Sequence, residues 1–238
     1  MIRSIFTLLF VAFGYLAAFP QAAFTWEYQE MLHSTPTGGQ YSNIVRVPGN
    51  GYLITGSVPI QMINSNVPII TRLNDQGQEL WNRRYDVFLN PPFSGPGPGA
   101  GAFFQRIIPT NDGGFLCGMQ ATEDWMIKFN AAGDTVWTKQ LPPFAINALQ
   151  TFDELTDGNL LYNVAIPQSN PDIIEPRLIR ADAAGNPLDS TTYTGLPYMW
   201  LSNTHAANNQ QVYMNGMDSS FNFSLIQLDS AGAIQWTN

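Results

Sequence analysis

The sequence predicts an all-β fold, a β-propeller of four-stranded antiparallel blades, and two observations carry this prediction. First, a phrase made of an apolar strand, an Asx-containing turn closed by Gly and a second strand occurs four times. Its glycines are 56, 52 and 47 positions apart, in or just above the period of propeller blades: Gly77, Gly133, Gly185 and Gly232. Second, an earlier turn rich in Asn, Asp or Gly precedes each phrase, which signals another hairpin. Two hairpins per repeat give four strands per blade.

Composition favours one folded, repetitive domain. The chain has 238 residues, of which 45% are hydrophobic and only 12% are charged, so there is enough apolar surface to offset the entropy of ordering. Ten Lys and Arg against 18 Asp and Glu give a net charge of −8, which repels phosphate backbones and anionic lipid. Nucleic acid is therefore excluded as an expected partner. Cys117 is the only cysteine, so no intrachain disulfide is possible.

The first 23 residues have the features of an export signal. Arg3 is the only early charge, and an apolar run from Ile5 to Phe19 ends near small residues. Such a run matches the core of a secretory signal and is shorter than the roughly 20 apolar residues of a membrane-spanning helix. We expect residues 1–23 to be cleaved, which leaves a secreted or cell-surface protein without an integral membrane segment. A buried N-terminal strand or an uncleaved anchor stays open as an alternative, because a clean A-x-A cleavage site is missing.

The remaining residues, 24–238, form the predicted repeat region. The second strand of each blade follows its first turn, at residues 52–56, 115–118, 159–164 and 211–216. The third and fourth strands flank the Asx-Gly turn, within residues 72–81, 128–137, 180–189 and 227–236. The predicted blades therefore span about 42–86, 104–141, 150–194 and 202–238.

The residues that recur in the four repeats have structural explanations. An Asx heads each turn, at Asn74, Asn130, Asp182 and Asp229. A calcium loop needs several alternating carboxylates, whereas only one Asx recurs here, so we expect the Asx side chain to cap its own turn. The recurrent tryptophans are expected to pack between adjacent sheets rather than to stack on a ligand: Trp81, Trp137 and Trp236.

The third repeat departs from the others in its fourth strand. Asp189 occupies the Trp position, and Pro187 lies where a strand is expected. Because proline cannot donate to a sheet ladder, the sequence predicts a short or irregular fourth strand at residues 186–193.

The second repeat carries a resemblance to a known family. It reads Asp112-Gly-Gly-Phe-Leu-Cys-Gly118, then Asp124-Trp-Met-Ile-Lys-Phe-Asn-Ala-Ala-Gly133-Asp-Thr-Val-Trp137. This pattern resembles the repeat of secreted bacterial and archaeal β-propeller proteins and covers the chain from about Ile44 to the end. The resemblance implies the architecture and an exported location, and it implies no particular activity.

The repeat is also distantly similar to that of quinoprotein propellers. Their docking motif is A-x-D-x-x-x-G-x-x-x-W, and here the interval from Asx to Gly is one residue shorter in every repeat. That departure argues against a pyrroloquinoline quinone site, and we expect no cofactor.

A lone fourth strand is predicted near Trp26, before the first blade. Propellers commonly close by letting an N-terminal strand complete the last blade. Because the fourth repeat already contains its own fourth strand, we expect either part of a longer propeller or an open arc of four blades.

The long connections between hairpins and between blades are the predicted binding face, because loops held by a rigid scaffold concentrate binding residues. Seven residues are candidates for contact with a protein or glycan ligand: Phe93, Phe103, Phe104, Trp125, Tyr198, Trp200 and His205. The sequence thus favours a secreted, non-catalytic scaffold or binding module. In the alternative, the Pro-Gly-rich stretch is a plain insertion and the aromatic residues cover a sheet edge.

No catalytic or metal-binding residue is assigned from the sequence. His33 and His205 are the only histidines, and neither a G-x-S-x-G elbow nor a phosphate-binding glycine loop is present. The carboxylate pairs Glu123-Asp124 and Asp153-Glu154 are adjacent, so their side chains are expected on opposite faces of a strand. The alternative function is a secreted carbohydrate-active hydrolase or lyase whose carboxylates converge in the central channel.

Overall fold

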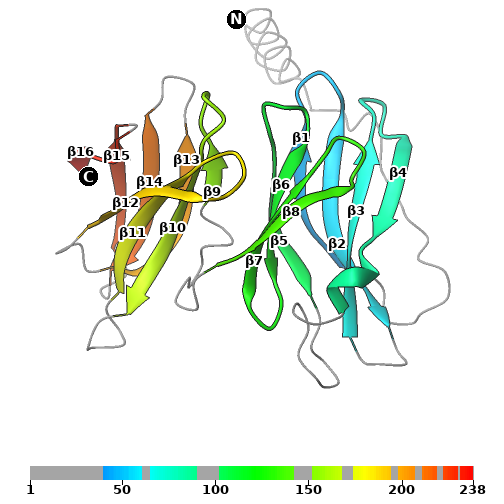
Figure 1. Cartoon of the computed structure of the whole chain (residues 1–238), viewed down its shortest axis with the longest axis horizontal. Helices are drawn as coiled ribbons and strands as arrows, with labels where there is room; N and C mark the ends of the chain where they lie inside the picture. Colours follow the sequence, from blue (N-terminus) through cyan, green and yellow to red (C-terminus); the bar gives the residue numbers. More distant parts are fainter. Residues whose placement is uncertain are drawn as a thin grey trace, which may run out of the picture.

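The chain forms an all-β propeller of four-stranded antiparallel blades, as the sequence predicts (Figure 1). The computed structural model describes residues 40–60, 65–89, 102–141, 152–167, 174–193, 198–206, 211–218, 222–229 and 231–237. In every blade the strands are paired in the order in which they occur in the chain. A single bridge, Ile174 opposite Tyr198, joins blades 3 and 4 into one eight-stranded sheet.

The strand bounds follow the repeat. Blade 1 contains β1 (Gln40–Arg46), β2 (Tyr52–Ile60), β3 (Ser65–Leu73) and β4 (Glu79–Arg84), followed by the short 3-10 helix η1 (Asp86–Leu89). Blade 2 contains β5 (Phe103–Pro109), β6 (Phe115–Gln120), β7 (Asp124–Phe129) and β8 (Thr135–Gln140). Blade 3 contains β9 (Phe152–Glu154), β10 (Leu160–Pro167), β11 (Ile174–Ala181) and β12 (Pro187–Thr192). Blade 4 contains β13 (Tyr198–Ala206), β14 (Val212–Asp218), β15 (Phe223–Leu228) and β16 (Ile234–Thr237).

Side-chain capping shapes the Asx-Gly turn of every blade. Asn74 Oδ1 accepts hydrogen bonds from the backbone nitrogens of Gln76 and Gln78, both at 2.9 Å. The same pair of bonds recurs at the other three Asx residues, Asn130, Asp182 and Asp229. The glycine that closes each turn has φ between 76° and 85°, a region that favours glycine. The predicted role of the Asx as a turn cap is confirmed.

The fourth strand of blade 3 is regular, so the prediction of a short or irregular strand was wrong. β12 has six residues, as do β4 and β8. Pro187 is tolerated because it is the first residue of the strand, opposite Ala181 at a register shift that all four blades share. At the position where other blades place Trp, Asp189 forms an ion pair with Arg180, the residue that faces it across the ladder. An ion pair therefore replaces the ring as the cross-strand contact.

Apolar residues bury the faces between successive blades. Blades 1 and 2 share a cluster that includes Leu53 and Ile70 on one side and Phe115 and Phe129 on the other. A second cluster joins blades 2 and 3, and a third joins blades 3 and 4; they include Leu116, Met126, Tyr162 and Ile179, and Leu161, Leu178, Met214 and Ile226, respectively. The blades are thus held by their faces, as in other repeat architectures.

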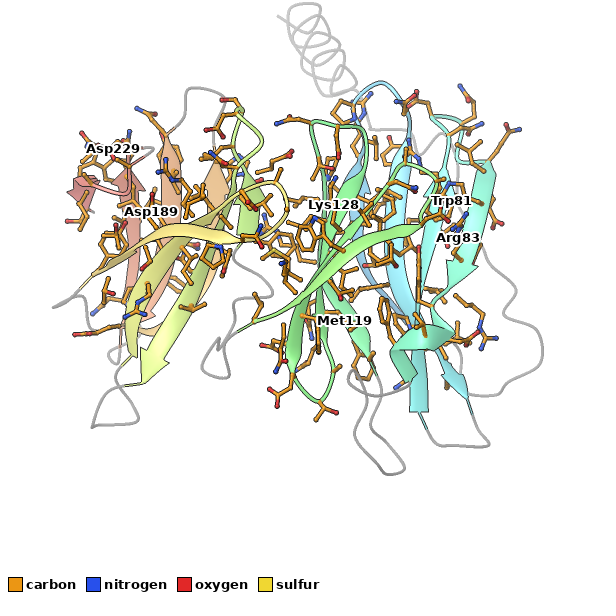
Figure 2. The ribbon with its side chains drawn as sticks, viewed as in Figure 1. Trp81, Arg83, Met119, Lys128, Asp189 and Asp229 are labelled. Carbon is orange, nitrogen blue, oxygen red and sulfur yellow. The ribbon has the colours of Figure 1, made fainter. Side chains whose placement is uncertain are left out.

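In blades 2, 3 and 4 the closing glycine of the Asx-Gly turn packs against the end of the preceding blade. A Cβ at Gly133 would lie 3.0 Å from the Trp81 ring and 3.1 Å from Arg83, two side chains that extend side by side from β4 (Figure 2). A Cβ at Gly185 would likewise lie 3.1 Å from the Trp137 ring. A Cβ at either position would crowd the neighbouring side chains, so glycine suits these positions for space as well as for φ. The two tryptophans pack between blades, as predicted.

Polar contacts lock the same junctions. Tyr85 Oη donates to the carbonyl oxygen of Gly133 at 2.9 Å, and Tyr193 Oη donates to that of Gly232 at 2.6 Å. At the junction between blades 2 and 3, Trp137 Nε1 donates to the carbonyl oxygen of Ala183 at 3.1 Å. Each inter-blade contact thus combines a packed ring with a hydrogen bond to the turn.

The outward face of blade 4 differs from its counterparts because it is exposed. Leu225 is 40% exposed, whereas the equivalent residues of the other blades, Ile70, Met126 and Leu178, are 0–5% exposed. Trp236 is 40% exposed and lies beside Tyr213, with ring centroids 6.5 Å apart. Blade 4 therefore exposes the fourth-strand side of an inter-blade contact, which is the side that carries the Trp.

Two sequence predictions fall outside the described residues: the export signal at 1–23 and the lone strand near Trp26. Within the described ranges, no helix has the length and apolar character needed to cross a membrane.

Replacing Tyr85 with Phe tests the inter-blade contact. We expect Tyr85→Phe to lower the free energy of unfolding by about 1 kcal/mol, because the variant removes one buried hydrogen bond and leaves the Gly133 carbonyl without it. Tyr213→Phe is the control, since its hydroxyl bonds Gln211 within blade 4 and not a neighbouring blade. Chemical denaturation measures both, and equal losses in the two variants would contradict the role assigned to Tyr85.

Candidate ligand pocket between the first two blades

The residues predicted as a binding face do not form one site. Phe93 lies outside the described residues. Tyr198, Trp200 and His205 belong to strand β13 of blade 4, while Phe103 begins β5 of blade 2 and is half-buried. The structure thus divides the described candidates between two blades.

Phe104 and Trp125 are core residues, and their placement on loops was wrong. Phe104 is 1% exposed and Trp125 is 7% exposed, and both belong to the cluster between blades 1 and 2. Trp125 lies in β7, opposite Met119 and Gln140. The strands are longer at the ends near the long connections than the sequence pattern indicates, so Phe104 and Trp125 lie within strands and are buried.

His205 contributes to a contact between the first strands of blades 3 and 4. Its Nδ1 lies 2.9 Å from Asp153 Oδ2, which also accepts a hydrogen bond from the backbone nitrogen of Ala206 at 2.9 Å. The neighbouring Glu154 binds in the other direction, to the backbone nitrogen of Asn111 in blade 2 at 2.6 Å. The two carboxylates therefore diverge toward different blades, as expected for adjacent strand residues.

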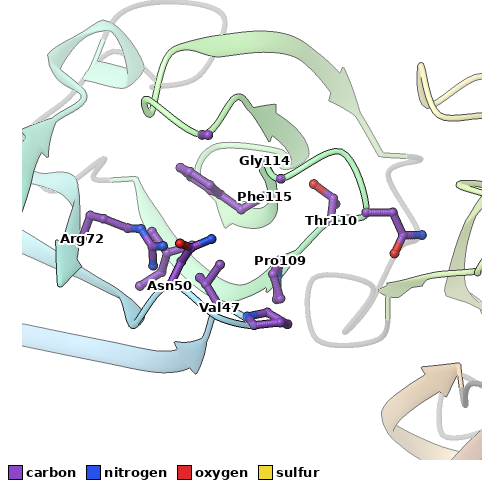
Figure 3. A pocket seen from close by; sticks show the side chains of 12 residues that line it. Val47, Asn50, Arg72, Pro109, Thr110, Gly114 and Phe115 are labelled. Atoms are coloured by element: carbon purple, nitrogen blue, oxygen red, sulfur yellow. The ribbon is translucent and has the colours of Figure 1, made fainter. Parts of the chain in front are cut away.

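A pocket of about 600 Å³ lies between blades 1 and 2, at the end of the sheets where the first turns of these blades are located (Figure 3). It is at the opposite end of the blades from the long connections that the sequence favours. Both blades contribute residues to its lining: Val47, Pro48, Asn50, Leu53, Arg72, Pro109, Thr110, Asn111, Gly113, Gly114, Phe115 and Ala131. Most of the wall is apolar, and Arg72 is the only charged residue among these twelve.

The walls of the pocket are held by tight turns. In blade 1 the backbone nitrogen of Val47 donates to the Gly51 carbonyl at 2.8 Å, and in blade 2 that of Thr110 donates to the Gly114 carbonyl at 3.0 Å. These bonds also align the two turns residue by residue, so that Gly49 corresponds to Asp112 and Pro48 to Asn111. The two turns have equal length but carry different chemistry.

In blade 2 this turn neutralises a buried cation. Lys128, on β7, has a side chain only 8% exposed, and its Nζ donates to both oxygens of Asp112, at 2.6 and 2.8 Å, and to Thr110 Oγ1 at 2.5 Å. Burial by itself would raise the pKa of Asp112. The hydrogen bonds from Lys128, Thr110 and Gly114, together with the Lys128 charge, outweigh burial and lower this pKa to about 2.

In blade 1 the equivalent cation has no such counter-ion. Arg72 faces Leu53 and Trp81 across the ladders, as Lys128 faces Leu116 and Trp137. The positions of Asp112 and Thr110, however, are occupied by Gly49 and Val47. The Arg72 Nη1 atom is buried and has no hydrogen-bond partner among the described residues.

The junction between blades 2 and 3 has polar contacts at positions where the junction between blades 1 and 2 has apolar residues. Between blades 2 and 3, Asn111 bonds Glu154 and, through its Nδ2, the Leu155 carbonyl at 3.0 Å. Between blades 1 and 2 the corresponding residues are Pro48 and Pro109, neither of which has a polar side chain. The space that polar contacts close in one junction is open as a pocket in the other.

Sequence reasoning missed this pocket, although a signal for it was present. The turn at residues 48–51 lacks the Asp of the second and third blades, while the third strand of the same blade keeps a cation, Arg72. Comparing the repeats at the first turn and the third strand together would have found the unmatched charge.

No protein-family model matches the chain, and no curated protein matches it either. Among solved structures, a Bacteroides caccae protein of unknown function is 16% identical, with a TM-score of 0.51, and the match covers 90% of this chain and 64% of that one. A cobalt-substituted Synechocystis apocarotenoid oxygenase is 13% identical, with a TM-score of 0.46, and 49% of its length is covered. This chain therefore spans less than two thirds of the first structure and about half of the second. The Bacteroides caccae likeness supports the fold alone.

Removing the Asp112 carboxylate tests the ion pair in blade 2. We expect Asp112→Asn to lower the free energy of unfolding by about 1 kcal/mol, because it leaves the buried Lys128 ammonium without its counter-ion while the 65% exposure of the Asp112 side chain limits the loss. Asp157→Asn, at the equivalent position of blade 3, is the control, since the Asp157 side chain accepts hydrogen bonds from Asn159 of its own turn and forms no ion pair within the described residues. If denaturant melts of the two variants coincide, the role assigned to Asp112 is wrong.

The same carboxylate predicts a pH dependence. Its pKa is lower in the folded protein than its ordinary value of 3.8, so its stabilisation is fully present above about pH 4 and is lost as the pH falls toward 2. Because the carboxylate is 65% exposed, solvent screening reduces this contribution to about 1 kcal/mol. Unfolding free energies measured from pH 5 to pH 2 should fall less steeply in Asp112→Asn than in the unmodified chain. Parallel curves would contradict this assignment.

Proposed function

We propose that this chain is an exported, non-catalytic binding module that holds part of a protein or glycan ligand in the pocket between blades 1 and 2. The observation that carries the proposal is the pocket itself, about 600 Å³ in volume, preformed and lined by an apolar wall with a few polar groups. Ligand sites in proteins have this size and this composition. Export rests on the sequence of residues 1–23 and on the repeat that the chain resembles.

The described chemical groups favour binding over catalysis. Asp153 and Glu154 are engaged with His205 and Asn111 in separate inter-blade contacts, so they do not face one substrate as a glycosidase pair would. Cys117 is fully buried, and burial raises the pKa of its thiol, which suppresses the reactive thiolate. Among the described residues, no group of three His, Cys, Asp or Glu side chains is placed to hold a metal ion.

The scaffold suits recognition because the pocket walls come from different blades whose mutual position is fixed. Trp81 stacks on Phe115 across the junction, with ring centroids 6.2 Å apart, and Tyr85 bonds the Gly133 carbonyl. A ligand that enters between the two turns would therefore meet a surface that is already organised, which lowers the entropic cost of binding.

Filling the pocket tests this proposal. Asn50 is an exposed turn residue at the pocket, and Asn50→Trp would place a large ring in the space. We expect ligands found by ligand-observed NMR, in a library of sugars, sugar acids and N-acetylated amino acids, to lose at least tenfold in affinity in this variant. Gln76→Trp, in the exposed Asx-Gly turn of the same blade and outside the lining, should bind normally. Absence of binding, or equal binding to both variants, would overturn the proposal.

A further inference from the structure

We propose that the ligand of this pocket carries a carboxylate, which binds the Arg72 guanidinium and takes the place that Asp112 holds beside Lys128 in blade 2. This inference rests on the proposed function and names the chemical class of its ligand. It follows from an internal comparison, because the same strand position is a cation in both blades while only one blade provides the anion.

The second blade shows what such a cation needs. Lys128 receives two carboxylate contacts and one hydroxyl contact, all within 2.8 Å, from a turn of its own blade. In blade 3 the equivalent Arg180 is likewise paired, with Nε 3.0 Å from Asp189 Oδ2. Cations at this position are matched by an intrachain carboxylate wherever they occur in the other blades.

Arg72 lacks a comparable match. Partial burial lowers its pKa, an effect that the charge of Asp75 opposes, yet no ion pair joins Arg72 to a carboxylate in the described part of the chain. Its Nη1 atom is buried without a hydrogen-bond partner. A partly buried guanidinium without a counter-ion costs free energy, and Arg72 lines the pocket, so a ligand carboxylate that pairs with the guanidinium offsets that cost on binding.

The surroundings of Arg72 favour a single carboxylate attached to an apolar body. Figure 3 shows the Arg72 and Asn50 side chains approaching each other on the blade 1 side of the pocket, with Phe115 across from them. A planar guanidinium binds a carboxylate through two parallel hydrogen bonds. A phosphate dianion would place a second negative charge between Val47 and the two prolines without a second cation to neutralise it. A monocarboxylate leaves no charge unpaired and sets its apolar part against the walls.

Amino-acid and sugar-acid carboxylates share this chemistry, and the two sources can be separated by binding measurements. N-acetyl-leucine presents the C-terminal carboxylate of a peptide, and glucuronate presents that of an acidic sugar. N-acetyl-leucinamide and glucose are the matched neutral compounds. Because the chain carries a net charge of −8, distant charges oppose anion binding, and the attraction must be local to Arg72.

Isothermal titration of the folded chain with these four compounds tests the inference. We expect at least one acid to bind at least tenfold more tightly than its neutral counterpart, and we expect Arg72→Gln to abolish this preference. Arg72→Lys, which keeps the charge but not the planar fork, should retain part of it. Arg180→Gln is the control, because it removes the equivalent residue of blade 3, which is not part of the pocket lining. Thermal melts establish that each variant is folded.

The outcomes separate this inference from the proposed function. If neutral compounds bind as well as the acids, and Asn50→Trp abolishes binding while Arg72→Gln does not, the pocket is a binding site but the carboxylate inference is wrong. If none of the compounds binds in a manner sensitive to Asn50→Trp, both fail. If an acid binds equally to Arg72→Gln and to the unmodified chain, the inference is overturned.

Discussion

The structure depends on the contact between the fourth strand of one blade and the Asx-Gly turn of the next. The turn must leave room for the Trp81 ring, which glycine at position 133 provides, and it must expose a carbonyl that Tyr85 can bond. The Asx cap fixes the turn in that shape without help from the neighbouring blade. The hydrogen bonds within a turn thus shape the surface against which the neighbouring blade packs. The phrase repeats because each junction needs both an Asx-Gly turn and a fourth strand. The fourth strand that carries the exposed Trp236 packs against no further blade in the described part of the chain.

The junction between blades 1 and 2 differs from the others because it places a cation, unpaired within the described residues, among apolar residues. The polar network between blades 2 and 3 ties the Asp112 turn to Lys128 and to Glu154. Between blades 1 and 2, prolines and aliphatic side chains take the corresponding positions, yet the cation Arg72 is retained. An apolar residue there would remove the cost of burying a guanidinium. Retaining Arg72 beside an open pocket is understandable if the missing anion comes from a ligand.

The sequence predicted the architecture well because the repeat encodes it locally. The Asx caps, the closing glycines and the partly buried tryptophans Trp81 and Trp137 all lie where the repeated phrase indicates. It failed where neighbouring strands decide the outcome. Pro187 was compatible with a regular strand because it begins that strand, and Phe104 was buried by Tyr85 and Phe88 of the preceding repeat and by Phe129 of its own blade. The candidate pocket was missed for a related reason, since its walls belong to two blades and its signal is a residue that one repeat lacks.

The most direct measurement of the central claim exchanges the turns. The whole first turn of blade 1 is replaced with that of blade 2 through Val47→Thr, Pro48→Asn, Gly49→Asp and Asn50→Gly, which offers Arg72 an intrachain carboxylate. All four residues are exchanged because φ is positive at Gly49 in blade 1 and at Gly113, the counterpart of Asn50, in blade 2. The control chain carries Gly49→Asn in place of Gly49→Asp, so that the two differ by one charge. The account predicts that the Asp-containing graft raises the free energy of unfolding by about 1 kcal/mol over the control and abolishes carboxylate binding that the control retains. Equal stability and equal carboxylate affinity in the two grafts would contradict it.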